Sequence, residues 1–205
     1  MSPFEDARVL AIVRYREPCD LGAVVDALRS GGINEIEITA DTPGALEAVA
    51  MAGESGAPIG AGTIRTVEDA RAFAGAGAAF LVSPGLVPQI VREGRALGVP
   101  TVPGVLSPTE VLGAVAAGSS TVKLFPASLG GVAYLGALRG PFPDVRFIPT
   151  GGVAIEDVPR WLEEGAACVG LGSALTRDAA PRTRADHERI TDHARRAVDL
   201  AGGDV

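Results

Sequence analysis

The stretch Val145-Arg146-Phe147-Ile148, followed by Ile155–Glu164 and then by Ala167-Cys168-Val169-Gly170-Leu171, decides the fold. The first and last of these segments are short, largely apolar runs, which are typical of buried strands. The middle segment has the apolar spacing of an amphipathic helix. Apolar strands that alternate with helices indicate a parallel sheet, because the connecting helices cover its faces.

The same alternation extends over the whole chain at intervals of roughly 20–25 residues and gives about eight β/α units. The other predicted strands are Val9–Val13, Glu35–Thr39, Pro58–Gly62, Phe80–Val82, Pro100–Pro103 and Ser120–Phe125. The other predicted helices are Leu21–Arg29, Gly44–Ala52, a helix that begins at Thr66, Val87–Leu97, Thr109–Ala117, a weaker helix near Tyr134–Leu138, and the C-terminal segment Arg184–Leu200. Eight such units predict a closed (β/α)₈ barrel, which is compact beside the ~250 residues typical of this fold.

We expect a single domain over residues 1–205, with a helical C-terminal segment at about 183–201, because no linker or low-complexity segment interrupts the alternation. The rival architecture is an open, doubly wound sheet. The dinucleotide-binding form of that sheet carries a G-x-G-x-x-G motif after its first strand. The chain has no such motif there, and Gly60-Ala61-Gly62 follows the third strand and lacks the third glycine.

The composition, with 47% hydrophobic and 21% charged residues, allows a sizeable core. A net charge of −7 argues against nucleic acid and anionic membranes as main partners. The N-terminal residues carry no secretory signal pattern, and no apolar stretch approaches the roughly 18 residues of a membrane helix. Cys19 and Cys168 lie far apart and outside any metal-ligand spacing, so we expect reduced thiols in a cytoplasmic protein.

Lysine and arginine together number 18, and Lys123 is the single lysine among them. It lies inside the apolar run Thr121-Val122-Lys123-Leu124-Phe125-Pro126. Arginine can replace lysine as a solvated charge, but not where a neutral amine must attack a carbonyl, because the guanidinium stays protonated. The placement therefore suggests a Schiff-base lysine. The alternative is a chance lysine whose stem packs at a strand end while its head reaches water.

Polar side chains gather at the C-terminal strand ends, where the active residues of such barrels lie. They are Arg14, Glu37, Thr39, Thr63, Ser83, Lys123, Thr150 and Ser173. Ile36 and Ile38 must face the helices, so Glu37 and Thr39 face the barrel interior. Val122 and Leu124 likewise face the helices, so Lys123 between them faces the barrel interior.

An interior carboxylate opposite an interior amine suggests a general acid–base group beside a nucleophile. The alternative for Glu37 and Lys123 is a buried ion pair with a structural role. Glu35 shares the inward face but lies nearer the other end of the barrel, so we expect a structural role for it. The two histidines, His187 and His193, fall in the polar C-terminal segment and are expected at the surface. No cluster has metal-ligand spacing, so the expected site is metal-free.

Glycine-rich segments follow the last two predicted strands, as Pro149-Thr150-Gly151-Gly152-Val153 and Gly170-Leu171-Gly172-Ser173. The loops after strands seven and eight of such barrels often form a phosphate site. Glycine lets the backbone approach closely, and exposed N–H groups bind an anion without a cation. We therefore expect phosphate binding here; the alternative is that these glycines only make tight turns.

The ordered set of motifs resembles the 2-dehydro-3-deoxy-phosphogluconate (KDPG) and 4-hydroxy-2-oxoglutarate (KHG) aldolase family from about Val9 to Leu175. The motifs are Glu37-Ile38-Thr39, Gly60-Ala61-Gly62-Thr63, Ser83-Pro84-Gly85, Pro103-Gly104-Val105, Lys123-Leu124-Phe125-Pro126-Ala127, Gly140-Pro141-Phe142-Pro143, Pro149-Thr150-Gly151-Gly152-Val153 and Gly172-Ser173. Single motifs are weak evidence, but the ordered set is specific.

The resemblance implies a class I, metal-independent aldolase on a (β/α)₈ barrel, usually a homotrimer, with a covalent lysine imine and no cofactor. It places the Schiff-base lysine at Lys123 and the acid–base glutamate at Glu37. The resemblance implies substrate contacts for the remaining matched positions. Thr63 matches a position near the pyruvate-derived carboxylate, Pro84 and Phe125 match pocket walls, and Thr150, Gly151, Gly152, Gly172 and Ser173 match the phosphate end.

One position departs from the family pattern. Some members have an arginine in the turn after Glu-x-Thr that helps to hold the anionic end of the substrate, and here that place is Asp41. Arg14 resembles the arginine at the end of strand one in other members. Since arginine binds carboxylates bidentately, Arg14 can take over that contact, with Thr39 beside it. Asp41 bears on substrate preference rather than on the chemistry.

The expected reaction is a reversible cleavage of 2-dehydro-3-deoxy-6-phosphogluconate to pyruvate and glyceraldehyde 3-phosphate, with cleavage of 4-hydroxy-2-oxoglutarate to pyruvate and glyoxylate as a further activity. One alternative is an aldolase for the 6-phosphogalactonate epimer. A phosphosugar isomerase or epimerase would use Glu37 as a base without a covalent amine. A non-catalytic barrel that binds a phosphate ligand is the third alternative.

Overall fold

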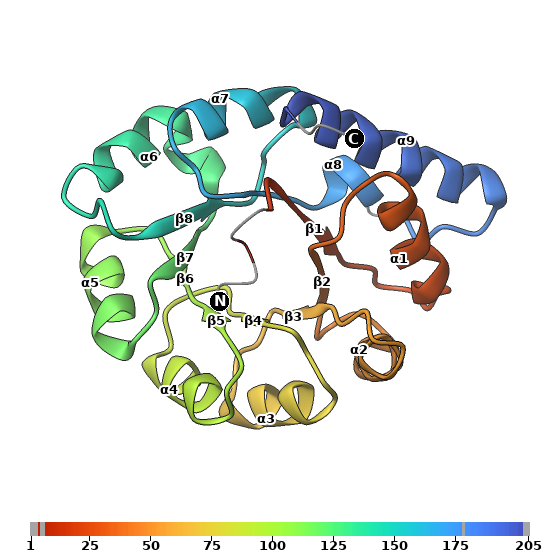
Figure 1. Cartoon of the computed structure of the whole chain (residues 1–205), viewed down its shortest axis with the longest axis horizontal. Coiled ribbons are helices and arrows are strands. Elements are labelled where there is room, and N and C mark those ends of the chain that lie inside the picture. The colour runs from red at the N-terminus through yellow and green to blue at the C-terminus, as the bar shows by residue number, and fades with distance from the viewer. Residues whose placement is uncertain (1–3, 5–6, 178, 203–205) are drawn as a thin grey trace.

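The computed structural model describes residue 4, residues 7–177 and residues 179–202. Its strands form a central barrel, and its helices form a ring around them (Figure 1). The strands are β1 (Val9–Val13), β2 (Ile36–Thr39), β3 (Gly60–Gly62), β4 (Leu81–Val82), β5 (Thr101–Val102), β6 (Gly104–Val105), β7 (Thr121–Leu124), β8 (Arg146–Pro149) and β9 (Val169–Leu171). The helices are α1 (Leu21–Ser30), α2 (Ala45–Glu54), α3 (Val67–Gly75), α4 (Pro88–Ala96), α5 (Pro108–Ala117), α6 (Gly131–Arg139), α7 (Val158–Glu163), α8 (Ser173–Thr176) and α9 (Arg184–Leu200), with 3₁₀ turns η1 (Ala127–Leu129) and η2 (Ile155–Asp157).

Two of the strand segments, β5 and β6, occupy one position in the barrel. Pro103 separates them, because proline has no N–H to donate to the ladder. Its carbonyl still accepts a hydrogen bond from the backbone N of Lys123 at 2.9 Å. Strand β4 pairs with β5, and β7 pairs with β6. The strand predicted for Pro100–Pro103 therefore continues beyond Pro103 and changes partner there.

The ring of strands closes on itself, and all its pairings are parallel. The strand orders are β5-β4-β3-β2-β1-β9 and β6-β7-β8. A bridge between Thr150 and Gly170 joins β8 to β9, and the backbone N of Ala167 donates to the carbonyl of Phe147 at 2.9 Å. These links give eight strand positions, so the predicted (β/α)₈ barrel is confirmed.

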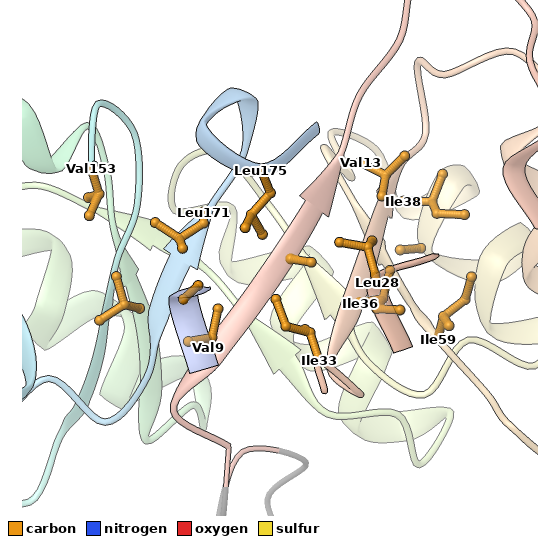
Figure 2. Packing of buried hydrophobic residues seen from close by; sticks show 14 of the residues in the cluster. Val9, Val13, Leu28, Ile33, Ile36, Ile38, Ile59, Val153, Leu171 and Leu175 are labelled. Carbon is orange, nitrogen blue, oxygen red and sulfur yellow. The ribbon is translucent and has the colours of Figure 1, made fainter. Parts of the chain in front are cut away.

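The strands bury side chains on both faces. Ile36 and Ile38 of β2 belong to the large core between strands and helices, to which Val9, Val13 and Leu171 also contribute (Figure 2). Because neighbouring residues of a strand point to opposite faces, Glu37 points into the barrel. The core outside the strands thus sets the direction of the polar residues inside.

The barrel interior is apolar at the end opposite the C-terminal strand ends. Phe4 is fully buried there in a cluster with Leu10, Phe80 and Cys168. The rings of Phe4 and Phe80 meet edge to face, with centroids 4.8 Å apart. Arg146 donates to the carbonyl of Phe4. Gly60 makes room for this packing, since a Cβ there would overlap the ring of Phe80.

Helix boundaries follow local capping signals. Thr66 caps α3 as predicted, through a reciprocal capping box with Asp69. A similar box, between Thr183 and Asp186, begins α9. The short helix α8 is absent from the prediction, because four residues are too few to show an apolar period.

Among the described residues, none of the helices combines the length and the apolar character that crossing a membrane requires.

Replacing Phe4 with Ala should lower the free energy of unfolding by about 3–5 kcal/mol, because it removes a fully buried ring and leaves a cavity against Phe80. Urea unfolding followed by circular dichroism measures the change. A loss below about 1 kcal/mol would contradict the assignment of Phe4 to the interior core.

Candidate active site

A cavity of about 940 Å³ lies at the C-terminal ends of the strands. Its lining residues come from β1, β7 and β9, from the segments that follow β1, β7, β8 and β9, and from α8. They are Ile12, Arg14, Arg16, Lys123, Phe125, Thr150, Gly151, Gly152, Val153, Ala154, Gly170, Gly172, Ser173, Ala174, Thr176 and Arg177. Three arginines and one lysine make this lining cationic, although the chain carries a net charge of −7.

Lys123 is held inside the barrel by its place on β7. The residue is only 6% exposed, and its register places it beside Gly104 of β6. Its Nζ lies 3.7 Å from Oε1 of Glu37 and 5.5 Å from the centroid of the Phe125 ring. The amine therefore faces the cavity between a carboxyl group and an aromatic ring.

Glu37 is completely buried on β2, and neither carboxyl oxygen has a hydrogen-bond partner among the described residues. Gly62 on the neighbouring strand makes its position possible, since a Cβ there would overlap the carboxyl group. Burial raises the pKa of Glu37 above its ordinary value, while Lys123 and, more weakly, Arg14 act to lower it. The carboxyl group is thus suited to exchange protons rather than to remain a fixed charge.

Arg14 is bound to three groups at the side of the cavity. It donates to Oγ1 of Thr63 at 2.6 Å and to Oγ1 of Thr39 at 3.5 Å. Its Nε also lies 3.7 Å from Oδ1 of Asp41. Asp41 thus places a carboxylate beside the guanidinium of Arg14 at the edge of the cavity.

The loops after β8 and β9 bring the backbone to the cavity wall. Gly151 and Gly152 have φ of 91° and 73°, which favours glycine. A Cβ on Gly151 would also come within 2.9 Å of the Phe125 ring. On β9, Gly170 leaves room for the side chain of Thr150.

The structure brings most of the predicted site residues together. Those that line the cavity are Arg14, Lys123, Phe125, Thr150, Gly151, Gly152, Gly172 and Ser173. Glu37 contacts Lys123, whereas Thr39 and Thr63 hydrogen-bond to Arg14. Pro84 is exposed in the loop after β4 and lies outside the lining set.

Sequence reasoning missed Arg16 and Arg177, which add positive charge to the lining. Arg16 follows the end of β1 by three residues, so strand parity does not give its direction. Arg177 comes directly after the unpredicted helix α8 and has a left-handed backbone with φ of 57°. A strained backbone at a cavity is a reason to examine the residue for a role in binding.

The lining offers no obvious ligand set for a metal ion. Within the described ranges, no three His, Cys, Asp or Glu side chains gather closely enough to hold one.

Comparison with known proteins gives consistent matches over nearly the whole chain. The family model for KDPG and KHG aldolase matches residues 2–192. The chain is 36% identical to 2-dehydro-3-deoxy-phosphogluconate aldolase of Treponema pallidum, over 97% of this chain and 95% of the relative. It is also 36% identical to a probable 2-dehydro-3-deoxy-6-phosphogalactonate aldolase of Rhizobium meliloti, over 82% of this chain and 81% of the relative.

The fold matches solved structures of similar proteins. One is a KDPG aldolase from Legionella pneumophila with pyruvate captured as a covalent carbinolamine intermediate. The TM-score is 0.83 at 32% identity, and the match covers 94% of each chain.

The raised pKa of Glu37 predicts a pH-dependent stability difference between the wild type and Glu37→Gln. The folded state favours the protonated carboxyl group, so this contribution to stability is fully present below the ordinary carboxyl pKa. It is lost as pH rises through the raised pKa. The free energy of unfolding of the wild type, measured with urea, should therefore fall relative to that of Glu37→Gln as the pH rises from about 4 to about 8.

The control for this series is Glu188→Gln, which changes an exposed carboxylate on α9 that pairs with Arg184. If the free energy of unfolding of the wild type instead rises with pH relative to that of Glu37→Gln, the fold stabilises Glu37 as a carboxylate and the prediction is wrong.

Proposed function

The chain belongs to the KDPG and KHG aldolase family, and we propose that it cleaves 2-dehydro-3-deoxy-6-phosphogluconate reversibly to pyruvate and glyceraldehyde 3-phosphate. The observation that carries this proposal is the 3.7 Å contact between Nζ of Lys123 and Oε1 of Glu37 beside the cavity. A class I aldolase needs one amine to form an imine and one group to move protons. This pair supplies both without a metal ion or a cofactor.

Lys123 acts as the nucleophile. Glu37 accepts a proton from the ammonium, and the neutral amine attacks the C2 carbonyl of the substrate. Glu37 gives this proton to the carbonyl oxygen and takes one from the attacking nitrogen, which completes the carbinolamine. It then passes that proton to the hydroxyl, which leaves as water, so the protonated imine forms and Glu37 is again a carboxylate. The imine then accepts the electron pair that carbon–carbon cleavage releases.

Glu37 moves the protons of the cleavage step. Its carboxylate removes the proton of the C4 hydroxyl, and the C3–C4 bond breaks as C4 becomes the aldehyde of glyceraldehyde 3-phosphate. The electron pair of that bond forms the enamine of pyruvate on Lys123. Protonation at C3 and addition of water at C2 release pyruvate and restore the amine. A carboxyl group with a raised pKa is suited to give and take protons in turn.

The two ends of the substrate meet different parts of the lining. Arg14 and Thr63, with Thr39 behind them, bind the carboxylate next to C2. Phe125, whose ring centroid lies 5.5 Å from Nζ of Lys123, covers the imine carbon.

The phosphate end lies against the two glycine-rich loops. Thr150, Gly151, Gly152, Gly172 and Ser173 bind it through the hydroxyl and N–H groups of these loops. Arg16 and Arg177 line the same cavity and add charge. Local donors and arginines thereby compensate for the acidic net charge of the chain.

A second substrate remains a specific candidate. The relative of Rhizobium meliloti is a probable aldolase for the 6-phosphogalactonate epimer. The pairing of Asp41 with Arg14 alters the charge on the side of the cavity that we propose to distinguish the two epimers. Comparison of kcat/KM on the two epimers and on 4-hydroxy-2-oxoglutarate ranks the substrates. No cleavage of any of them would favour a phosphosugar isomerase or a phosphate-binding barrel.

We place the enzyme in the cytoplasm as a homotrimer of one-domain chains spanning residues 1–205. The free thiols of Cys19 and Cys168 suit a reducing compartment. Exposed apolar side chains on α5 and η1, namely Leu112, Val115 and Leu129, offer surface for subunit contacts.

Lys123→Arg tests the mechanism, because it retains a cation beside Glu37 but removes the nucleophilic amine. Release of pyruvate, measured with a lactate dehydrogenase coupled assay, should fall by far more than the ~10²–10⁴-fold typical of losing an acid–base group. Circular dichroism and thermal melting would show that the variant is folded. Turnover within about tenfold of the wild type would overturn the lysine mechanism.

A further inference from the structure

The short helix α8 forms part of the cavity wall, and neighbouring elements hold its C-terminal carbonyl groups. Ser173, Ala174 and Thr176 of this helix line the cavity. A helix of four residues forms only a few backbone hydrogen bonds of its own, from Leu175 and Thr176 to Gly172 and from Arg177 to Ser173, and these do not fix its direction against the barrel. Its orientation therefore depends on the groups that bind its ends.

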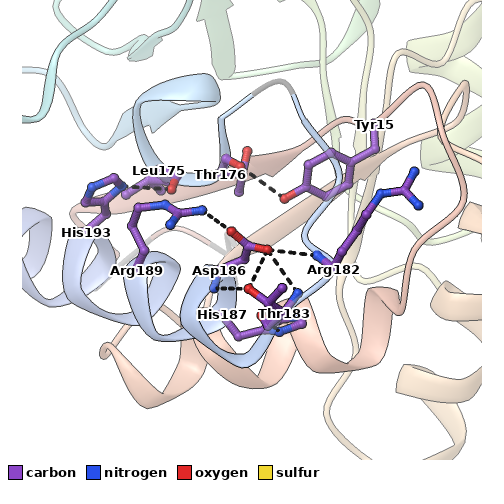
Figure 3. Close-up of polar contacts among 9 residues, drawn as sticks. All are labelled: Tyr15, Leu175, Thr176, Arg182, Thr183, Asp186, His187, Arg189 and His193. Atoms are coloured by element: carbon purple, nitrogen blue, oxygen red, sulfur yellow. Dashed lines mark hydrogen bonds and ion pairs between the residues drawn. The ribbon is translucent and has the colours of Figure 1, made fainter.

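One of these groups is His193 of α9. Its Nδ1 lies 3.1 Å from the carbonyl oxygen of Leu175 (Figure 3). A carbonyl oxygen can only accept, so Nδ1 carries the proton in this contact. Leu175 is fully buried, and its carbonyl would otherwise lose a partner on folding.

The second group is Tyr15, which follows β1. Its hydroxyl donates to the carbonyl oxygen of Thr176 at 3.2 Å (Figure 3). Tyr15 is 1% exposed, and burial raises its pKa to about 12, so the hydroxyl keeps its proton at neutral pH. Two adjacent carbonyls of α8 are thus bound from two different elements.

Helix α9 is a firm support for His193. Asp186 accepts hydrogen bonds from the backbone N of Arg182 and Thr183 at 3.0 and 2.9 Å and pairs with Arg189. Its pKa lies well below the usual carboxyl range because of these contacts. Helix α9 also packs on α1, where Thr191 donates to the carbonyl of Ala27 at 3.0 Å.

We propose that His193 and Tyr15 are positioning residues that set the direction of α8 and so tune the affinity of the cavity for the phosphate end of the substrate. Through α8 they fix Gly172 and Ser173 at its N-terminal end and Arg177 after its C-terminal end. Neither residue belongs to the cavity lining, so each acts through the backbone it binds. The proposal rests on the proposed function, in which this wall binds phosphate.

The effect should be selective for phosphate because the reacting pair lies on other elements. Lys123 is on β7 and Glu37 is on β2, and neither of them contacts His193 or Tyr15 in a described hydrogen bond or ion pair. Loss of one neutral hydrogen bond that orients a binding wall costs roughly tenfold in affinity. The imine chemistry should remain unchanged.

The test compares His193→Ala and Tyr15→Phe with the wild type on two substrates. One is 2-dehydro-3-deoxy-6-phosphogluconate, and the other is 4-hydroxy-2-oxoglutarate, which has no phosphate. Each variant should raise KM for the phosphorylated substrate about tenfold at unchanged kcat. On the unphosphorylated substrate, both parameters should stay within about twofold of the wild type.

The chain supplies matched controls. His187 lies on the same helix and its Nδ1 contacts the carbonyl of Thr183 at 3.0 Å rather than α8, so His187→Ala should leave both substrates unaffected. His193→Asn keeps a donor near the place of Nδ1 and should recover most of the lost affinity. Thermal melting would show whether each variant is folded.

Binding of inorganic phosphate, measured by isothermal titration calorimetry, gives a readout that does not depend on turnover. His193→Ala and Tyr15→Phe should weaken it by the same factor as they raise KM. Equal losses on both substrates, unchanged phosphate affinity, or no phosphate binding by the wild type would overturn the positioning role. If the wild type cleaves neither substrate, the proposed function fails, and the phosphate affinities alone decide the role of His193.

Discussion

The contact between Lys123 and Glu37 inside the barrel is the interaction on which the rest of the structure depends. Placing two ionisable groups in a closed interior is costly unless they interact or perform chemistry. The fold makes room for them with Gly62, where any side chain would displace the carboxyl group. Burial raises the pKa of Glu37 and the lysine beside it acts to lower that pKa, a balance that suits the proton exchange proposed for this pair.

The two ends of the barrel differ in character, because one end is filled by apolar packing and the other end forms the cavity. At one end, Phe4 and Phe80 fill the interior with apolar packing. At the other end, glycine-rich loops and arginines surround a cavity that suits an anion. A family member with pyruvate held as a carbinolamine fits the chemistry proposed for this arrangement. Beside that cavity, the carboxylate of Asp41 lies 3.7 Å from Nε of Arg14.

The periodic features were predictable from the sequence because they follow from strand parity and chain alternation. Ile36 and Ile38 fix the inward direction of Glu37, and the eight β/α units give the barrel. Features that depend on contacts distant in sequence were missed. Phe4 enters the barrel interior through tertiary packing, α8 is too short to show a period, and Arg177 reaches the cavity only because α8 places it there. Pro84, which the resemblance places in the pocket wall, lies outside the lining.

Reductive trapping with pyruvate tests the central claim most directly. The protein is incubated with pyruvate and sodium borohydride, digested, and examined by peptide mass spectrometry for the reduced adduct. Lys123 is the only lysine of the chain, so the N-terminal amine is the only competing primary amine. The account predicts one reduced pyruvate adduct on the peptide that contains Lys123. The absence of that adduct under conditions where the protein releases pyruvate from substrate would contradict the imine mechanism.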